Sequence, residues 1–326
     1  MAVFPDPAQS PFRRPDAAPL DPAKFRDPVL TARGEPRAQV PLAALTTLWF
    51  NTGTLCNLAC ATCYIESSPT NDALVYLSAA EVAGFLDEIE RDRLPVREIG
   101  LTGGEPFMNR ATVPIIADAL GRGFEVLVLT NAMRPMRRFE ADLLTLREDH
   151  GERLTLRVSL DHHTPQVHEA ERGAGSWAKA VDGLRWLAGK GFRLAVAGRM
   201  LPGEEEGEAR AAYKLLFASL GVPVDAADPA RLVLFPEMDV AADIAEISEG
   251  CWSILGTSPA SVMCSGSRMV VKRKGEPSPR VAACTLLPYD RQFDLGATLA
   301  EASGPVALNH PHCARFCVLG GASCSA

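Results

Sequence analysis

Apolar residues in the middle of the chain follow two alternating patterns. Short apolar runs typical of strands are separated by longer stretches in which apolar residues recur every three or four positions, as in helices. The expected strands are residues 45–50, 98–101, 125–130, 154–160, 193–200 and 231–235. The expected helices are residues 79–93, 113–121, 139–148, 177–189 and 208–219.

This alternation predicts an α/β fold with a parallel sheet, because a helix between two strands brings the second strand back in the same direction. Ser78 and Glu81 form a capping-box pattern at the start of the first helix. Six strand–helix units are too few for an eight-fold barrel, so residues 45–240 are expected to form a partial (β/α)6 TIM-like barrel. Its site is expected in the loops that follow the carboxyl ends of the strands.

The two ends of the chain differ from this middle part. Residues 1–44 contain nine prolines, which exclude a long helix or a central strand. We expect an extended arm over the surface, or a partly disordered one. Residues 241–326 contain six of the nine cysteines and are expected to form a small Cys-rich β-hairpin/α domain.

The composition of the chain argues against several classes of function. A net charge of −7 argues against a nucleic-acid partner, and the absence of a run of about 18 apolar residues argues against a membrane span. The N-terminus has no basic region followed by an apolar core, so no secretory signal is expected. We therefore expect a cytoplasmic protein with reduced thiols, in which nine cysteines indicate metal or cluster ligation before disulfides.

Cys56, Cys60 and Cys63 follow the first expected strand with the spacing C-x3-C-x2-C. A cuboidal iron–sulfur cluster has four irons that are normally capped by four thiolates. Three clustered cysteines would therefore leave one iron open to another ligand. Taken alone, the three cysteines could also hold a structural zinc ion.

Polar motifs also follow the next strands. Gly103, Gly104 and Glu105 end the second strand, where the glycines would let the backbone approach a ligand and the carboxylate could meet an ammonium group. The later strands end in Asn131, in Ser159 with Asp161, and in Arg199. His162 and His163, just beyond Asp161, are candidate acids, bases or substrate contacts, although a position in a surface loop is the commoner outcome for such histidines.

The order of these motifs resembles that of the radical S-adenosylmethionine (SAM) superfamily over about residues 45–240. The resemblance implies that Cys56, Cys60 and Cys63 hold a [4Fe–4S] cluster whose fourth iron binds SAM. An electron from an external donor, such as flavodoxin or ferredoxin, then cleaves SAM to a 5′-deoxyadenosyl radical, which removes a hydrogen atom from the substrate. The implied SAM contacts are Tyr64, Gly103, Gly104, Glu105, Asn131, Ser159, Asp161 and Arg199. Thr62 departs from the family pattern, which has an aromatic or apolar residue before the third cysteine.

The C-terminal cysteines suggest a second site. Cys264 and Cys284 flank a predicted β-hairpin, and Cys313, Cys317 and Cys324 follow with the spacing C-x3-C-x6-C. This pattern is similar to the SPASM/twitch auxiliary-cluster module of some radical SAM enzymes. The similarity implies a second [4Fe–4S] cluster on Cys264, Cys284, Cys313 and Cys317, with Cys324 as a possible replacement. A zinc site on Cys313, Cys317 and Cys324, with His310 or His312, stays open.

The substrate is least determined by the sequence. Relatives with an auxiliary cluster oxidise or rearrange small polar metabolites, or modify and cross-link ribosomally made peptides. The Pro-rich arm is too short for a leader-binding winged helix, so a small metabolite is slightly favoured. A non-catalytic iron–sulfur assembly or electron-transfer protein is the alternative of another class, but the Gly-Gly-Glu and Ser-Leu-Asp motifs argue against it.

Overall fold

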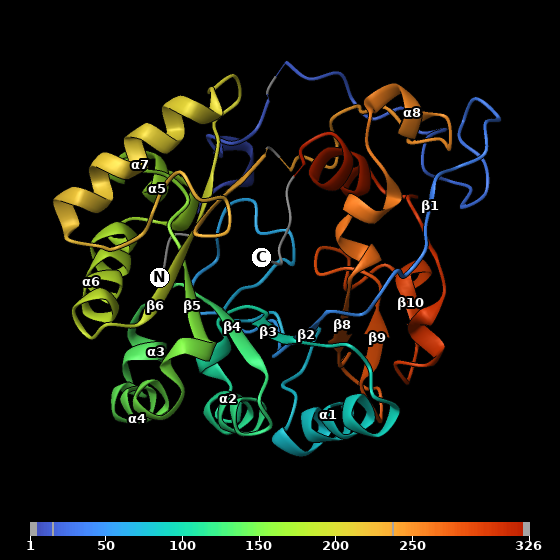
Figure 1. Cartoon of the computed structure of the whole chain (residues 1–326). Helices are drawn as coiled ribbons and strands as arrows, with labels where there is room; N and C mark the ends of the chain where they lie inside the picture. The colour runs from blue at the N-terminus through green and yellow to red at the C-terminus, as the bar shows by residue number, and fades with distance from the viewer. Residues whose placement is uncertain (1–4, 15, 237, 322–326) are drawn as a thin grey trace.

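A nine-stranded sheet organises the computed structural model, which describes residues 5–14, 16–236 and 238–321 (Figure 1). The strand order is β10-β9-β8-β2-β3-β4-β5-β6-β7. The six consecutive strands from β2 to β7 pair in parallel. They are β2 (Thr47–Asn51), β3 (Glu98–Thr102), β4 (Glu125–Thr130), β5 (Leu154–Ser159), β6 (Arg193–Arg199) and β7 (Leu232–Phe235).

Helices connect these strands, and Figure 1 shows α1, α2, α4, α6 and α7 on the outside of the curved sheet. The α-helices are α1 (Ala79–Asp92), α2 (Thr112–Gly121), α3 (Arg134–Arg137), α4 (Glu140–His150), α5 (Pro165–Arg172), α6 (Ser176–Gly189), α7 (Glu206–Leu220) and α8 (Cys251–Leu255). Short 3-10 turns are η1 (Pro7–Gln9), η2 (Pro106–Met108), η3 (Gly151–Arg153), η4 (Pro259–Ser261), η5 (Met263–Ser265), η6 (Arg291–Phe293) and η7 (Glu301–Ser303), and η8 (Cys313–Val318) is a π-helical segment.

All six strands and five helices predicted from the pattern are present, with ends within two residues of those expected. The predicted capping box is also formed: Glu81 N donates to Ser78 Oγ (3.2 Å), and Ser78 N donates to the Glu81 carboxylate (2.9 Å). The pattern missed α3, α5 and α8, which have eight residues or fewer. A helix this short contains too few turns for a periodic apolar face to stand out.

Both faces of the parallel strands are buried, as expected for a sheet covered on two sides. Leu48 and Phe50 of β2 pack in the core formed with the outer helices, whereas Trp49 between them packs in a second core shared with the C-terminal region. Gly100 of β3 makes room for that indole, since a Cβ there would lie 2.3 Å from the Trp49 ring. Trp49 thus lies on the inner side of the sheet.

The C-terminal hairpin extends the barrel sheet. Strands β8 (Ser267–Val271) and β9 (Arg280–Ala282) pair antiparallel, and β10 (Asp294–Gly296) follows β9. The other edge of β8 pairs in parallel with β2. The hairpin was expected from its sequence, but its pairing with the first barrel strand was not. Residues 241–326 as a separate domain remain a prediction.

The N-terminal arm is extended and is held by the C-terminal region. Strand β1 (Gln39–Val40) pairs antiparallel with β11 (Val306–Ala307). The buried Arg37 guanidinium forms an ion pair with Glu246 at 2.5 Å and donates to the Leu308 carbonyl oxygen at 3.2 Å. Residues 1–44 as a separate arm remain a prediction.

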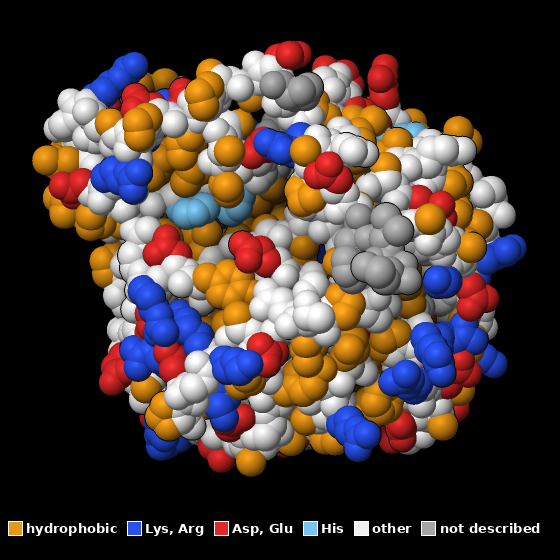
Figure 2. All heavy atoms as spheres, turned by 180° about the vertical axis from the view of Figure 1, so that it is seen from behind, with side chains coloured by type: hydrophobic (Ala, Val, Ile, Leu, Met, Phe, Trp, Pro, Cys, Tyr) orange, Lys and Arg blue, Asp and Glu red, His pale blue; other side chains and the backbone are white. Residues whose placement is uncertain are grey.

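Figure 2 shows one face of the molecule, on which basic and acidic side chains are interspersed. A hollow with hydrophobic and histidine side chains at its edge lies in the upper half of this view. Among the described residues, no helix combines the length and the apolar character needed to cross a membrane.

Candidate functional site

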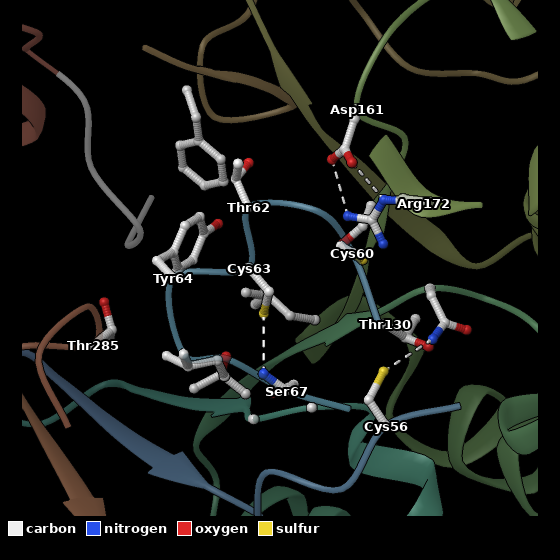
Figure 3. Close-up of a pocket in the computed structure, with 18 of the residues that line it drawn as sticks. Cys56, Cys60, Thr62, Cys63, Tyr64, Ser67, Thr130, Asp161, Arg172 and Thr285 are labelled. Atoms are coloured by element: carbon white, nitrogen blue, oxygen red, sulfur yellow. Dashed lines mark hydrogen bonds and ion pairs between the residues drawn. The ribbon is translucent and has the colours of Figure 1, made fainter. Parts of the chain in front are cut away.

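The three cysteines of the loop after β2 face one cavity of about 960 Å³ at the carboxyl ends of the parallel strands (Figure 3). Two of the thiols accept backbone hydrogen bonds, from Leu58 N to Cys56 Sγ and from Ser67 N to Cys63 Sγ, both at 3.4 Å. Every cysteine among the described residues is a free thiol. The loop therefore presents three thiols to one space, and their role as metal ligands remains a prediction.

Burial controls the ionisation of these thiols. It raises the pKa of Cys56 to about 12 and raises that of Cys60 further. A thiolate at this position therefore needs a cation beside it, and iron bound to the sulfur would supply one. Three convergent, buried thiols fit a cluster with one open iron, and the cavity beside them leaves space for a further ligand.

Most of the residues predicted to contact SAM line the same cavity. They are Tyr64, Gly103, Gly104, Asn131, Ser159, Asp161 and Arg199. The lining also contains Trp49, Glu171, Arg172, Phe235, Thr285 and Leu286, which the sequence did not single out as site residues. The last two follow β9, so they reach the cavity only because the hairpin joins the barrel sheet.

Glycine is needed at positions 103 and 104 mainly because the backbone of the cysteine loop packs directly against them. A Cβ on Gly104 would lie 2.3 Å from the Leu55 carbonyl oxygen, and one on Gly103 would lie 2.5 Å from the Gly53 carbonyl oxygen. Gly104 N also donates to Gly53 O at 2.8 Å. The sequence related these glycines to the approach of a ligand; the structure adds that they let two backbone segments touch.

Glu105 lies behind the cavity wall and is buried, and it is not among the residues that line the cavity. Its carboxylate accepts hydrogen bonds from Thr130 Oγ1 (2.9 Å), Asn131 N (2.8 Å) and Phe107 N (3.2 Å). Burial raises the pKa of Glu105 to about 7 despite these donors. In this structure the carboxylate therefore fixes the end of β4, where Thr130 and Asn131 line the cavity.

Asp161 forms a buried ion pair with Arg172, the last residue of α5 (Figure 3). Arg172 Nε and Nη2 donate to the two carboxylate oxygens at 2.6 and 2.9 Å. Burial alone would raise the pKa of Asp161, but the Arg172 guanidinium holds it below its ordinary value. The bidentate pair orients both oxygens of Asp161 at the edge of the cavity.

Arg199 is paired within the protein. Its Nη1 lies 3.0 Å from Glu171 Oε1 and donates to Thr62 Oγ1 at 2.8 Å. Thr62 is the position at which the chain departs from the family pattern, and its hydroxyl lies in this ion-pair network. Arg199 lines the cavity as expected, but its charge is already matched by Glu171.

His162 and His163 lie beside the site but do not line the cavity. Both come close to Glu204, and the three side chains have ligand atoms within 4.8 Å of one another. Thr164 N donates to His162 Nδ1 at 3.1 Å, however, which places the ring proton on Nε2, 3.7 Å from Glu204 Oε1. A protonated nitrogen is a donor, so this group is better described as a polar cluster than as a metal site.

His162 also departs from the surface position that the sequence left open, because it is only 3% exposed. Its ring stacks on that of His163 with centroids 3.9 Å apart. Burial lowers the pKa of His162 to about 4, so the ring is neutral near pH 7. Glu204 was missed because it follows a different strand, and nothing in its local sequence connects it to the two histidines.

Four C-terminal cysteines line a second cavity of about 360 Å³. They are Cys264, Cys284, Cys313 and Cys317, and apart from His312 their neighbours in the lining are apolar. Burial raises the pKa of Cys264 to about 11 and raises that of Cys313 further. Cys324 lies outside the described residues.

His312 but not His310 lines this second cavity, and Cys251 does not line it. Leu286 lines both cavities, so a single side chain is part of both walls. Four thiols around one space fit a second cluster by the chemistry of the donor set. Four thiols would also fit a structural zinc ion.

Comparison with known proteins identifies the family. The model of the radical SAM superfamily matches residues 50–216, about half of the chain. The chain belongs to the radical SAM superfamily. Membership implies a [4Fe–4S] cluster and SAM as cofactors.

Two curated relatives each match part of this radical SAM protein. Mycofactocin maturase MftC of Mycobacterium ulcerans is 32% identical over 137 residues, which are 42% of this chain and 35% of that protein. The antilisterial bacteriocin subtilosin biosynthesis protein AlbA of Bacillus subtilis is 31% identical over 169 residues, 52% of this chain and 35% of that protein. The match thus spans about a third of each relative's length.

The fold is similar to that of SuiB from Streptococcus suis, whose structures include complexes with S-adenosylmethionine and with the precursor peptide SuiA. The SAM complex superimposes with a TM-score of 0.56 at 11% identity, covering 78% of this chain and 64% of SuiB. At this identity the similarity concerns the fold alone.

Proposed function

We propose that the protein is a radical SAM enzyme that modifies a peptide with the help of two iron–sulfur clusters. The observation that carries the proposal is the convergence of Cys56, Cys60 and Cys63 in one cavity with the ends of strands β3 to β6. A cysteine loop for zinc would need no such cavity. An electron-transfer protein would need no polar strand ends beside its cluster.

In this proposal Cys56, Cys60 and Cys63 hold the first cluster, and SAM occupies the cavity beside it. When bound, the cluster and SAM together supply reductive cleavage of SAM to a 5′-deoxyadenosyl radical. The chain orients the cofactor: each Asp161 oxygen accepts one bond from Arg172 and retains a lone pair for a ribose hydroxyl. The backbone of Gly103 and Gly104 and the polar groups of Thr130 and Asn131 form the wall next to it.

Cys264, Cys284, Cys313 and Cys317 would hold the second cluster in the apolar cavity behind Leu286. Because Leu286 and the neighbouring Thr285 also line the first cavity, the two sites share a wall. Apolar surroundings exclude water from a reactive site and so limit side reactions there. A cluster in this position would lie next to the space in which a substrate radical forms.

The relatives support a peptide substrate over the small metabolite that the sequence favoured. MftC is named a maturase, AlbA a bacteriocin biosynthesis protein, and SuiB has been solved with a precursor peptide. The sequence argument against a peptide depended on the short arm, and a separate leader-binding protein would remove it. A small polar metabolite remains the alternative substrate.

Anaerobic reconstitution with iron, sulfide, a reductant and SAM tests the proposal. We expect 5′-deoxyadenosine by chromatography, and about eight iron and eight sulfide per chain. Iron uptake without 5′-deoxyadenosine would favour the non-catalytic iron–sulfur protein, and about four iron with one zinc would exclude the second cluster. Incubation with short peptides encoded beside the gene, followed by mass spectrometry, tests the substrate; a mass change in a metabolite and in no such peptide would contradict the peptide assignment.

A further inference from the structure

Glu171, near the end of α5, lines the first cavity and is buried at a junction of three distant segments, but none of the roles proposed above belongs to it. Only 1% of the residue is exposed. Its side chain meets Thr62 in the cysteine loop, Arg199 at the end of β6 and Ser10 in the N-terminal arm. A buried carboxylate with this many fixed partners holds a single orientation.

The contacts with the cysteine loop involve the two residues between Cys60 and Cys63. Ala61 N donates to the Glu171 carbonyl oxygen at 2.8 Å. Thr62 N and Thr62 Oγ1 both donate to Glu171 Oε1, at 2.8 and 2.9 Å. One residue of α5 therefore binds both peptide N–H groups that separate the second cysteine from the third.

The arm approaches the same network from the other side. Ser10 Oγ donates to Glu171 Oε2 at 2.7 Å. The Phe12 ring lies 4.1 Å from the guanidinium carbon of Arg199, and Arg13 pairs with Asp239 at 3.1 Å. Ser10 and Phe12 are themselves buried, so residues 10–13 are packed against the site.

We propose that Glu171 is a positioning residue for the half of the cysteine loop that contains Cys60 and Cys63, and that the arm, through Ser10, holds Glu171 in place. Metal ligands function when hydrogen bonds from surrounding groups hold them within about 0.5 Å of their binding geometry. Here Ala61 and Thr62 are held directly, and the two flanking thiols indirectly. That the thiols bind a cluster depends on the function proposed above. That Glu171 fixes the position of the thiols does not depend on it.

Alkylation of the full chain before reconstitution tests the positioning without any cofactor. In Glu171→Ala we expect iodoacetamide to modify Cys60 and Cys63 at least fivefold faster than in the wild type, measured by peptide mass spectrometry. Cys264 and Cys313 in the second cavity have no hydrogen bond to Glu171 among those described and serve as internal references whose rates stay unchanged. Glu171→Gln should show a smaller increase, because its amide oxygen can still accept from Thr62 N.

The arm is tested by Ser10→Ala, which removes one hydroxyl and leaves the carboxylate intact. We expect an increase of about twofold in the alkylation of Cys60 and Cys63. Two neighbours are matched controls with no contact to the loop: Glu169→Gln on the same helix and Gln9→Ala on the arm. If Glu171→Ala fails to fold, as judged by circular dichroism, Glu171→Gln and Ser10→Ala still decide the question.

Reconstituted protein supplies the second measurement. In Glu171→Ala we expect the iron content to fall from about eight to about four, or the electron paramagnetic resonance signal of the reduced cluster to lose its response to SAM. Native alkylation rates together with a native SAM response in the Glu171 variants would overturn the inference. A wild-type protein that makes no 5′-deoxyadenosine would instead overturn the proposed function, while leaving the alkylation result to stand.

Discussion

The two cysteine sites are built in opposite ways. Around Cys56, Cys60 and Cys63 the protein places buried ion pairs and hydrogen-bonded carboxylates, namely Asp161 with Arg172, Glu171 with Arg199, and Glu105 with Thr130. The cavity lined by Cys264, Cys284, Cys313 and Cys317 has otherwise apolar walls with one histidine, and the buried Arg268 beside Cys264 does not line it. The first cavity is also the larger, at about 960 against 360 Å³.

This difference indicates different tasks. Directional polar groups can orient a ligand with its own charges and hydroxyls, as SAM has, whereas apolar walls enclose a metal group without contacting another molecule specifically. A site for chemistry and a site for a stored or transferred electron would differ in this way. The comparison can be tested at each site separately.

The largest effect should come from the cysteines themselves. In Cys56→Ala we expect 5′-deoxyadenosine formation to fall at least 100-fold, because the cluster proposed to cleave SAM would lose a ligand. In Cys284→Ala we expect cleavage to continue within about tenfold of the wild type, with iron falling from about eight to about four. An equal loss of SAM cleavage in both variants would contradict the proposal that only the first site cleaves SAM.

Breaking a charge pair should destabilise the first site strongly. Asp161→Asn leaves the Arg172 guanidinium buried without its counter-charge, which costs about 3–5 kcal/mol in the free energy of unfolding. Arg91→Ala, in the exposed pair with Asp92, is the control and should leave the free energy of unfolding nearly unchanged, because water screens this pair. Urea unfolding measures both, and similar values for the two would contradict the importance of the buried pair.

Glu105 makes the first site sensitive to pH. Its pKa is raised to about 7 in the folded chain, so the folded state binds a proton that the unfolded state releases above its ordinary pKa. The protein should therefore lose stability as pH rises from about 4.5 to 7, by on the order of 3 kcal/mol from this group.

Glu105→Gln cannot ionise and should flatten this part of the stability profile of the SAM-free protein. The exposed Glu208→Gln in α7 serves as control and should keep the wild-type profile. Unfolding free energies at pH 5 and pH 8 give the comparison. A wild-type slope preserved in Glu105→Gln would show that another group is responsible.

Gly104 tests the contact between the two loops. In Gly104→Ala the added Cβ would lie 2.3 Å from a backbone carbonyl oxygen of Leu55, so one loop has to move, at about 1–3 kcal/mol. Gly121→Ala in α2 meets no atom within 4 Å and should be neutral or stabilising by about 0.5–1 kcal/mol. Thermal unfolding and SAM-binding measurements together check this prediction, because a displaced cysteine loop should also lower the affinity for SAM.

The sequence predicted those parts of the molecule that have local signals. The alternation of strands and helices located the barrel, and Ser78 with Glu81 marked a helix start correctly. The cysteine spacing and the polar strand ends led to one cavity because parallel strands end on the same side of the sheet. Gly103 and Gly104 were recognised too, although their packing against the cysteine loop was not.

What the sequence did not reveal depends on long-range contacts. Glu171 and Arg172 lie on a short helix, and their partners Thr62 and Asp161 are brought to them only by the tertiary fold. The orientation of Glu105 away from the cavity is likewise set by Thr130 and Asn131. The pairing of β8 with β2 connects residues about 220 positions apart and leaves no pattern in either segment.

That pairing has a consequence for how the barrel avoids association with other chains. In a six-stranded partial barrel β2 would be an edge strand, with its free N–H and C=O groups and five buried residues available to another strand. Strand β8 occupies that edge, and β9 and β10 carry the sheet on to a shorter, more polar border. The hairpin between Cys264 and Cys284 therefore also protects the edge of the barrel sheet. A barrel truncated before it would expose β2, next to the cysteine loop, to pairing with a strand of another chain.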